Sequence, residues 1–183
     1  VNELVLIDLD QKRLMGEVMD LNHGLAFAPK KMQITSGDYQ DCQDADIVCI
    51  CAGVHQKPGD TRLDLIGDNS RIFESIVTKV VQAGFDGIFL IATNPVDAMS
   101  YLTWKFSGFD PKKIIGSGTT LDTARLRYLV SEKLHINPKN VHAYVMGEHG
   151  DSEFVPWNSA NIGLNQIRRY LNDDELNEIC DEV

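Results

Sequence analysis

Several common features are missing from this sequence, and each absence narrows what the protein does. No stretch is strongly basic, and 17 Lys and Arg residues stand against 27 Asp and Glu, which gives a formal net charge of −10. A nucleic-acid partner is not expected, because no basic stretch could neutralise a phosphate backbone. A membrane partner is not expected either, since a surface role would need the same positive charge and no apolar run approaches spanning length.

Paired cysteines are also missing. The chain has four cysteines but no C-x-x-C pair, so a metal site of the zinc type is not expected. Cys49 and Cys51 stand two apart in an apolar run, while Cys42 and Cys180 are isolated. Reduced thiols in a cytoplasmic protein are the simplest interpretation, and no signal or transit pattern is visible.

An initiator Met is absent, and the strand-like stretch "ELVLID" begins by residue 3. The sequence ends on "LNEICDEV", within an amphipathic helical pattern. We expect both ends to be cuts through a larger protein.

Short apolar runs alternate with longer helical patterns along most of the chain. Strands are expected at 3–8, 45–51, 87–93 and 112–118, and the run at 45–51 is typical of a strand buried on both sides. Helices are expected at 11–27, 64–83, 96–106 and 120–134. The alternation predicts an α/β fold with a doubly wound parallel sheet. After residue 118 the pattern changes to strands without intervening helices, which predicts a second, mixed domain.

Ligands of open parallel sheets bind beyond the carboxyl ends of the strands, so the residues that follow each strand are candidates for a binding site. The first strand is followed by Asp8, whose carboxylate could accept hydrogen bonds from the ribose diol of a dinucleotide. The alternative is that Asp8 or Asp10 caps the next helix. The Gly-rich phosphate loop that should precede such a strand is not in the sequence. The run at 45–51 leads into a loop that starts near Gly53, a potential hinge, and carries Gln56 and Arg62. Such loops often close over a substrate, although an ordinary solvated loop is the alternative.

The next strand ends in "ATNPVD", where Pro95 keeps Asn94 out of the helical region and leaves its amide free to orient a ligand. Simple turn chemistry is the alternative. In "LDTAR", Asp122 and Arg125 share one helix face, either as a surface ion pair or facing a cleft. The stretch "MGEHGDSEF" places His149 between acids and glycines.

Together these segments resemble the L-lactate/malate dehydrogenase family over essentially the whole chain. The matching motifs are "VLIDLD", "MDLNHG", "AGVHQKPGDTRLDL", "TNPVD", "GSGTTLDTARLR" and "GEHGDSE". The resemblance implies a Rossmann-type sheet that lacks its first strand, followed by part of an α+β catalytic domain. Residues 1–117 would be the partial dinucleotide-binding domain, and residues 118–183 the partial catalytic, substrate-binding domain. The stretch "QKPGDTRLDL" is most similar to the bacterial lactate branch, because malate enzymes usually carry Arg where Gln56 stands.

By this resemblance the cofactor is NAD and the substrate pair is L-lactate and pyruvate. His149 would accept and donate the substrate proton, and Asp122 would fix its tautomer. Arg125 would bind the substrate carboxylate, and Arg62 would polarise the carbonyl. Asn94 would orient the carbonyl oxygen and, with Asp8 and Gly53, contribute to the cofactor site. Glu148, Asp151 and Glu153 are interpreted as structural or solvated.

The resemblance also pairs Arg127 with His142. In allosteric bacterial members of the family these positions bind fructose 1,6-bisphosphate across a subunit interface, which implies a homotetramer. The alternative is a solvated helix residue beside an ordinary strand residue. Two other functions stay open: a malate or other 2-hydroxy acid dehydrogenase, and an inactive fragment or binding module that keeps the fold. Gln56 argues against malate, because it offers no positive charge to a second carboxylate.

Overall fold

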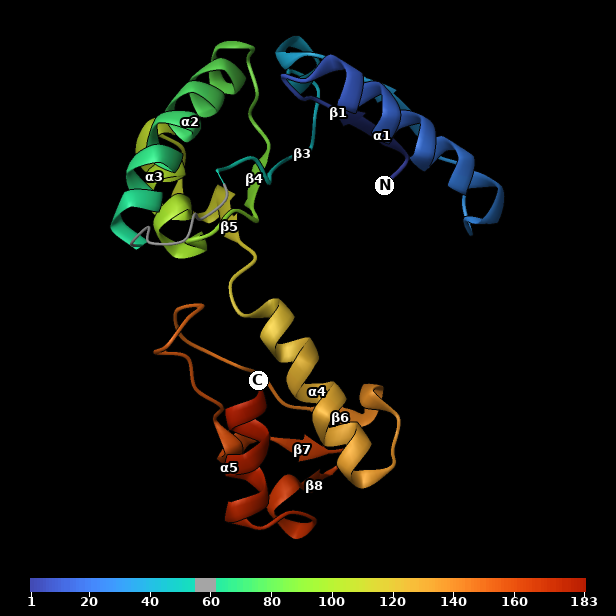
Figure 1. The fold of residues 1–183 in the computed structure, drawn as a ribbon, viewed down its shortest axis with the longest axis vertical. Helices are drawn as coiled ribbons and strands as arrows, with labels where there is room; N and C mark the ends of the chain where they lie inside the picture. The colour runs from blue at the N-terminus through green and yellow to red at the C-terminus, as the bar shows by residue number, and fades with distance from the viewer. Residues whose placement is uncertain (55–61) are drawn as a thin grey trace.

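The computed structural model describes residues 1–54 and 62–183, and for residues 62–64 it describes the backbone alone. The α-helices of this part of the chain are α1 (Gln11–Gly24), α2 (Arg62–Gln82), α3 (Val96–Ser107), α4 (Thr120–Leu134) and α5 (Asp173–Glu182). The strands are β1 (Glu3–Leu6), β2 (Gln33–Ser36), β3 (Ile47–Ile50), β4 (Ile88–Ile91), β5 (Ile114–Gly116), β6 (Val141–His142), β7 (Asn161–Ile162) and β8 (Asn165–Gln166). Short 3-10 turns join several of them (Figure 1).

The strands of the N-terminal part all pair in parallel, with helices in the connections. β1 pairs with β2, and β3, β4 and β5 form a sheet in that order. Parallel strands joined through helices are the arrangement that the alternating pattern predicts, and the predicted fold class is confirmed. Among the residues described, β1 and β3 share no backbone pairing, so the parallel strands lie in two separate sheets (Figure 1).

The larger core lies where α2 and α3 pack on the β3–β4–β5 sheet. Phe73 and Val77 of α2, Phe89 of β4 and Met99 of α3 are all fully buried. The Phe85 and Phe89 rings meet edge to face, with their centroids 4.9 Å apart. Such a cluster fixes the position of β4, and therefore of the residues that follow its carboxyl end.

One expectation about this sheet is wrong. The run at 45–51 was expected to be buried on both sides, but Ile47 is 56% exposed and Cys49 is also exposed. Val48 and Ile50 point into the core that α2 and α3 cover. Within the described residues the opposite face of β3 has no such cover, so alternate side chains of this apolar strand remain accessible.

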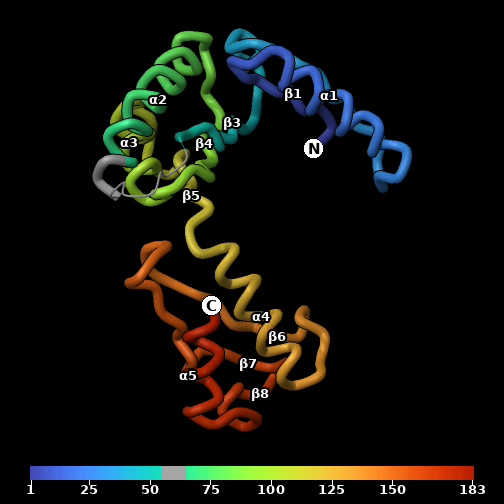
Figure 2. Tube along the Cα trace, in the orientation of Figure 1, coloured from blue at the N-terminus to red at the C-terminus, as the bar shows by residue number. Residues whose placement is uncertain are grey.

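The C-terminal part has its own core between α4, α5 and a small antiparallel sheet. That sheet has the order β6–β7–β8. Leu126 and Val130 of α4 pack with Val141 of β6 and with Leu176 and Ile179 of α5. This mixture of helices and antiparallel strands is the mixed architecture predicted after residue 118. The segment between β5 and α4 carries the chain into this part, and the loop after β6 reaches back toward β5 (Figure 2).

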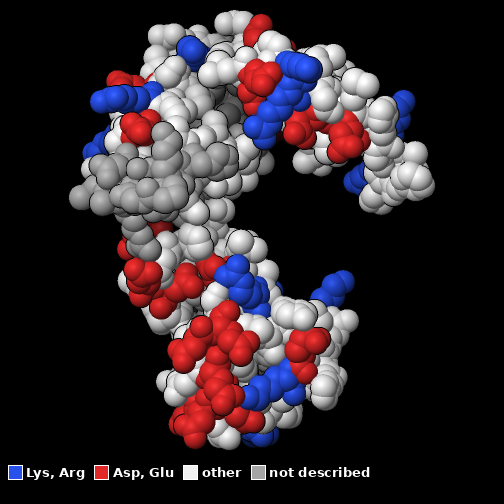
Figure 3. Space-filling view, in the orientation of Figure 1, with Lys and Arg blue, Asp and Glu red and all other residues white. Residues whose placement is uncertain are grey.

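Acidic side chains gather over the part of the surface that contains α5 (Figure 3). The helix starts with Asp173, Asp174 and Glu175, and Asn172 and Glu175 form a reciprocal capping box. Carboxylates in a first helical turn are stabilised by the helix dipole, which accounts for their concentration there. Of the helices in the described residues, none has the length and apolar character needed to cross a bilayer.

Candidate active site

His149 lies on a tight loop closed by a short antiparallel bridge. Met146 and Phe154 exchange two backbone hydrogen bonds of 2.9 Å at the base of the loop. Gly147 has a φ of +104°, and a Cβ there would lie 3.3 Å from the Ser152 carbonyl oxygen. Glycine is therefore required by the turn that brings the His149 backbone into place.

The imidazole of His149 is held by a buried carboxylate. Its Nδ1 lies 2.7 Å from Oδ2 of Asp122, which is in the first turn of α4 and only 3% exposed. The position at a helix N-terminus stabilises the Asp122 carboxylate. A buried acid that accepts from one ring nitrogen fixes the tautomer and presents the other, Nε2, to a substrate. The side chain of His149 is itself 29% exposed, so a ligand can reach it.

Two threonines lock the start of α4 against the residues that lead to the His149 loop. Thr119 donates through Oγ1 to the Val145 carbonyl oxygen at 2.7 Å, and the Val145 amide donates to Thr123 Oγ1 at 3.0 Å. These contacts set the separation between Asp122 and His149. Neither threonine was singled out in the sequence, because a hydroxyl in a first helical turn is too common to be informative.

Arg125 follows Asp122 on the same face of α4. Its Nη1 lies 3.4 Å from Asp122 Oδ1 and also donates to the Val183 carbonyl oxygen. Since Asp122 is buried, the pair is not the ordinary surface ion pair that its spacing alone would suggest. The Arg125 side chain remains 45% exposed, so it is accessible to an anionic ligand.

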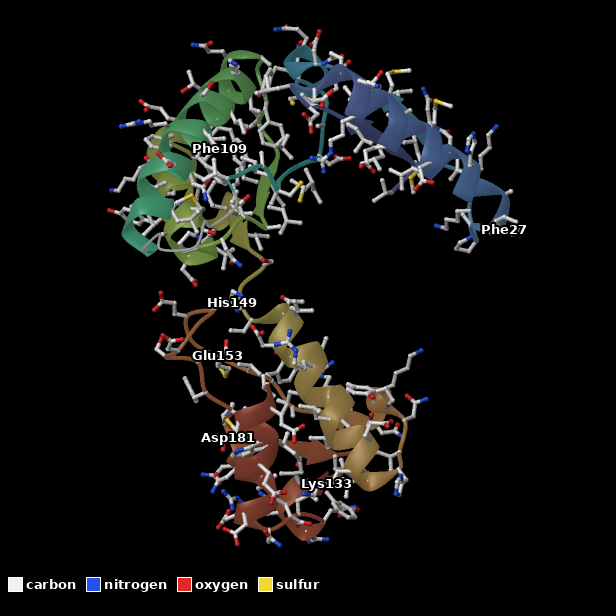
Figure 4. All side chains as sticks on the ribbon, viewed as in Figure 1. Phe27, Phe109, Lys133, His149, Glu153 and Asp181 are labelled. Atoms are coloured by element: carbon white, nitrogen blue, oxygen red, sulfur yellow. The ribbon has the colours of Figure 1, made fainter. Side chains whose placement is uncertain are left out.

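The carboxyl end of β4 is tied to the His149 loop. Asp97, in the first turn of α3, accepts a 3.1 Å hydrogen bond from the His149 backbone amide. Asn94 precedes it, exposed at the strand end, and its peptide bond to Pro95 is cis. The structure thus brings Asn94, Asp122 and His149 to one region, and Figure 4 shows His149 beside the N-terminal end of α4.

Two buried polar residues that the sequence analysis missed organise the strand ends. Asn69 of α2 is fully buried; its Oδ1 accepts from the Val54 amide at 2.9 Å, and its Nδ2 donates to the Asn94 carbonyl oxygen at 3.1 Å. Thr93 donates through Oγ1 to the Ala52 carbonyl oxygen at 2.9 Å. Asn69 lies on the same helical stripe as Phe73 and Val77, and a polar residue on an apolar stripe was the signal that could have identified it.

Of the predicted cofactor residues, Asp8 and Gly53 lie beyond the carboxyl ends of β1 and β3, and Asn94 lies beyond that of β4. Asp10, not Asp8, caps α1, since its Oδ1 accepts from the Lys12 and Arg13 amides, each at 3.0 Å. Asp8 is exposed just beyond β1 and accepts from the Asp10 amide at 2.8 Å. A Cβ on Gly53 would lie 2.7 Å from Thr93 Cγ2, so the backbone approaches its neighbours closely there. An exposed acid after one strand and a glycine after another fit a dinucleotide.

Two of the predicted residues are beyond what the structure describes. Gln56 lies outside the described residues. Arg62 begins α2, but its side chain is not described. Their predicted parts in substrate recognition therefore rest on the sequence.

Arg127 lies on α4 and His142 on β6, and these two elements contact each other in the C-terminal part. Arg127 donates through Nε to the Ala143 carbonyl oxygen at 3.0 Å, and its guanidinium lies 4.6 Å from the Tyr144 ring centroid. An open hollow of about 590 Å³ beside it is also lined by Lys139 and three threonines. His142 is exposed on β6 but is not among the residues that line this hollow. Arg127 and Lys139 give the hollow positive charge, as an anion site requires.

Comparison with known proteins places this geometry in a family. Residues 1–116 match the family model for the NAD binding domain of lactate/malate dehydrogenases, and residues 119–183 match that for their alpha/beta C-terminal domain. An L-lactate dehydrogenase from Bacillus pumilus is 58% identical over 184 residues, covering 100% of this chain and 58% of the relative. One from a Geobacillus strain is 59% identical, covering 95% of this chain and 54% of the relative.

Solved structures of lactate dehydrogenases resemble this chain in fold as well as in sequence. The ligand-bound minor L-lactate dehydrogenase of Enterococcus mundtii superposes with a TM-score of 0.95 at 46% identity, covering 100% of this chain and 60% of that one. A lactate dehydrogenase from a Medee basin deep-sea metagenome library gives 0.93 at 51% identity, covering 98% and 59%. The chain therefore spans a little over half the length of the relatives it matches. The NAD binding domain agrees with the predicted cofactor. With both family models matched in order along its length, the chain belongs to the lactate/malate dehydrogenase family.

Proposed function

We propose that the full-length protein containing this chain is an NAD-dependent L-lactate dehydrogenase that interconverts L-lactate and pyruvate. The observation that carries the proposal is the 2.7 Å contact between His149 Nδ1 and the buried Asp122 carboxylate. A histidine oriented in this way can act as a general base in one reaction direction and as a general acid in the other. The names of the relatives support lactate as the substrate.

In the oxidation direction, the substrate hydroxyl gives its proton to His149 Nε2. Asp122 then stabilises the imidazolium through the Nδ1–H hydrogen bond. When bound, NAD supplies the acceptor for the hydride, which leaves the substrate carbon with the electron pair of the broken C–H bond. In the reduction direction His149 returns the proton to the carbonyl oxygen.

The remaining roles are those that the family resemblance implies. Arg125 binds the substrate carboxylate in a forked geometry, and Asn94 orients the reacting oxygen. Arg62 polarises the carbonyl, and the neutral amide of Gln56 sets the preference for the substrate side chain. Asp8 holds the adenosine ribose and disfavours the 2′-phosphate of NADP. We place the domain boundary between residues 117 and 118.

The competing function is a malate or other 2-hydroxy acid dehydrogenase. Gln56 favours lactate, because the second carboxylate of oxaloacetate would be buried there without a counter-charge. The test is to follow NADH loss by the full-length protein with pyruvate, oxaloacetate and 2-oxoisocaproate in parallel. Pyruvate should give the highest kcat/KM, and a preference for either of the others would reassign the substrate. Absence of turnover with all three would favour an inactive protein that retains the fold.

We further propose that Arg127 and His142 bind fructose 1,6-bisphosphate in a cytoplasmic homotetramer. The cationic hollow beside Arg127 supports a phosphate ligand. The sugar bisphosphate should lower the apparent KM for pyruvate, more strongly at acidic to neutral pH, where a protonated imidazole is the better phosphate partner. A flat response with no change in oligomer size would reject this site.

A further inference from the structure

Glu153 points its carboxylate at the same imidazole that Asp122 holds. It lies at the far end of the His149 loop, four residues after the histidine, and Figure 4 shows the two together beside α4. Oε2 of Glu153 is 3.8 Å from His149 Nδ1. Glu153 was expected from the sequence to be structural or solvated, but its side chain is only 21% exposed.

The environment of this oxygen is unusual. Oε2 of Glu153 is buried and, among the residues described, has no hydrogen-bond partner. A buried carboxylate oxygen without a donor is costly unless a positive charge lies close to it. In the part of the chain that the structure describes, the group that pairs with this oxygen is the His149 ring, which is positively charged when protonated.

The other charged side chains around His149 also favour a positive charge on its ring. They are Asp122 and Arg125 from α4, Asp97 from α3, and Glu148, Asp151 and Glu153 from its own loop. Among the side chains that the structure describes, these carboxylates outnumber the Arg125 guanidinium. The ring nitrogen and the nearest oxygens of Asp122 and Glu153 all lie within 4.8 Å of one another. Two carboxylates at that separation repel each other, and a proton on the imidazole between them relieves the repulsion.

Glu153 also acts electrostatically on a thiol of α5. The pKa of Cys180 is raised, first by partial burial and then by the negative charges of Asp181 and Glu153. A metal site is a poorer fit, because the 2.7 Å contact to Asp122 already uses Nδ1 in a hydrogen bond.

We propose that Glu153 is a second carboxylate partner of His149, a positioning residue that stabilises the imidazolium formed when His149 takes the substrate proton. The inference rests on the proposed dehydrogenase function. Asp122 fixes the orientation of the ring through a hydrogen bond, whereas Glu153 adds a negative charge near the ring without a hydrogen bond to it. Its contribution is therefore to set the pH range in which His149 is protonated.

The test is the pH profile of both reaction directions in the full-length enzyme carrying Glu153→Gln. Loss of the charge weakens proton binding by His149. The alkaline limb of pyruvate reduction, which needs the proton, should move down by about one pH unit, and the acidic limb of lactate oxidation should move down equally. A merely structural role would lower both rates without moving either limb. Glu153→Asp keeps the charge and should leave both limbs near their wild-type positions.

Glu148→Gln is the matched control, because it removes the same charge from the same loop while its carboxylate contacts Ser152. It should move both profiles less than Glu153→Gln does, because it lacks the 3.8 Å contact with the ring that Glu153 makes. NMR titration of the His149 ring nitrogens gives a second readout that needs no turnover, and its midpoint should fall further in Glu153→Gln than in Glu148→Gln. Unmoved limbs and an unmoved midpoint in Glu153→Gln would overturn the inference. A wild-type enzyme without pyruvate reduction would instead overturn the proposed function, and the NMR titration would still decide the part played by Glu153.

Discussion

Replacing Asp122 by asparagine probes the acid–base couple with little change in shape. The substitution keeps the size of the side chain but removes the charge that lies 2.7 Å from His149 Nδ1. A hydrogen bond to a charged group contributes roughly 1.5–3 kcal/mol. At about 1.4 kcal/mol per tenfold in rate, loss of that stabilisation predicts a fall in kcat of roughly tenfold to 150-fold.

The fold should survive this change. Asp122 also interacts with the N-terminus of α4, which is worth about 0.3–1 kcal/mol, well below the stability of a typical domain. Circular dichroism and NADH binding should therefore be close to wild type, while steady-state pyruvate reduction falls. His149→Asn should cost more, because it removes the proton carrier itself.

A suitable control is Asp110→Asn. Asp110 caps the 3-10 turn that precedes β5, whereas Asp122 follows that strand. Oδ1 of Asp110 accepts a hydrogen bond from the Lys112 amide. It should leave kcat unchanged. If Asp122→Asn kept wild-type kcat while Asp110→Asn behaved the same way, the buried carboxylate would have no part in proton transfer.

The other predictions concern specificity, backbone packing and a thiol. Gln56→Arg in the full-length enzyme should raise kcat/KM for oxaloacetate and lower it for pyruvate. The ratio of the two values should change on the order of a hundredfold, since a buried charge pair is worth roughly 2–5 kcal/mol. An unchanged preference would show that Gln56 does not determine the choice between these substrates. Gly53→Ala should lower the free energy of unfolding in urea by about 1–3 kcal/mol and weaken NADH binding, because the added Cβ would lie 2.7 Å from a Thr93 methyl carbon. The control Gly67→Ala has open space at its position in α2 and should be neutral or stabilising. Equal effects of the two substitutions would refute the packing argument. The raised pKa of Cys180 leaves less thiolate at a given pH, so iodoacetamide should alkylate Cys180 only at a higher pH than it alkylates a free cysteine. Glu153→Gln should lower that pH, as measured by mass spectrometry of the Cys180 peptide. Identical alkylation curves for the wild type and Glu153→Gln would contradict the electrostatic effect of Glu153.

Much of the fold was predictable because its signals are local. The apolar spacing of "TLDTARLRYLVSEKL" predicted a helix over 120–134, and α4 spans those residues. The strand at 87–93 contains β4, which is buried against α2 and α3. Burial of β3 was not predictable from its own residues. Whether Ile47 is covered depends on which elements pack on each face, and composition does not reveal that.

The candidate site was predictable in part for the same reason. Asp122 and His149 could be selected by motif, but their 2.7 Å contact depends on the threonines that join α4 to Val145. The partial burial of Glu153 was not predictable, because nearby acids in the sequence are exposed and the closed loop buries its Oε2. Long-range packing decides such cases.

The most direct test of the proposed function is one assay on two proteins. NADH consumption with pyruvate should be measured for the full-length wild type and for His149→Asn, with NADH binding measured in parallel. We expect turnover in the wild type, loss of turnover by several orders of magnitude in the variant, and similar NADH affinity in both, because the imidazole acts on the substrate and not on the cofactor. Comparable turnover in the two proteins would contradict a mechanism in which His149 carries the proton.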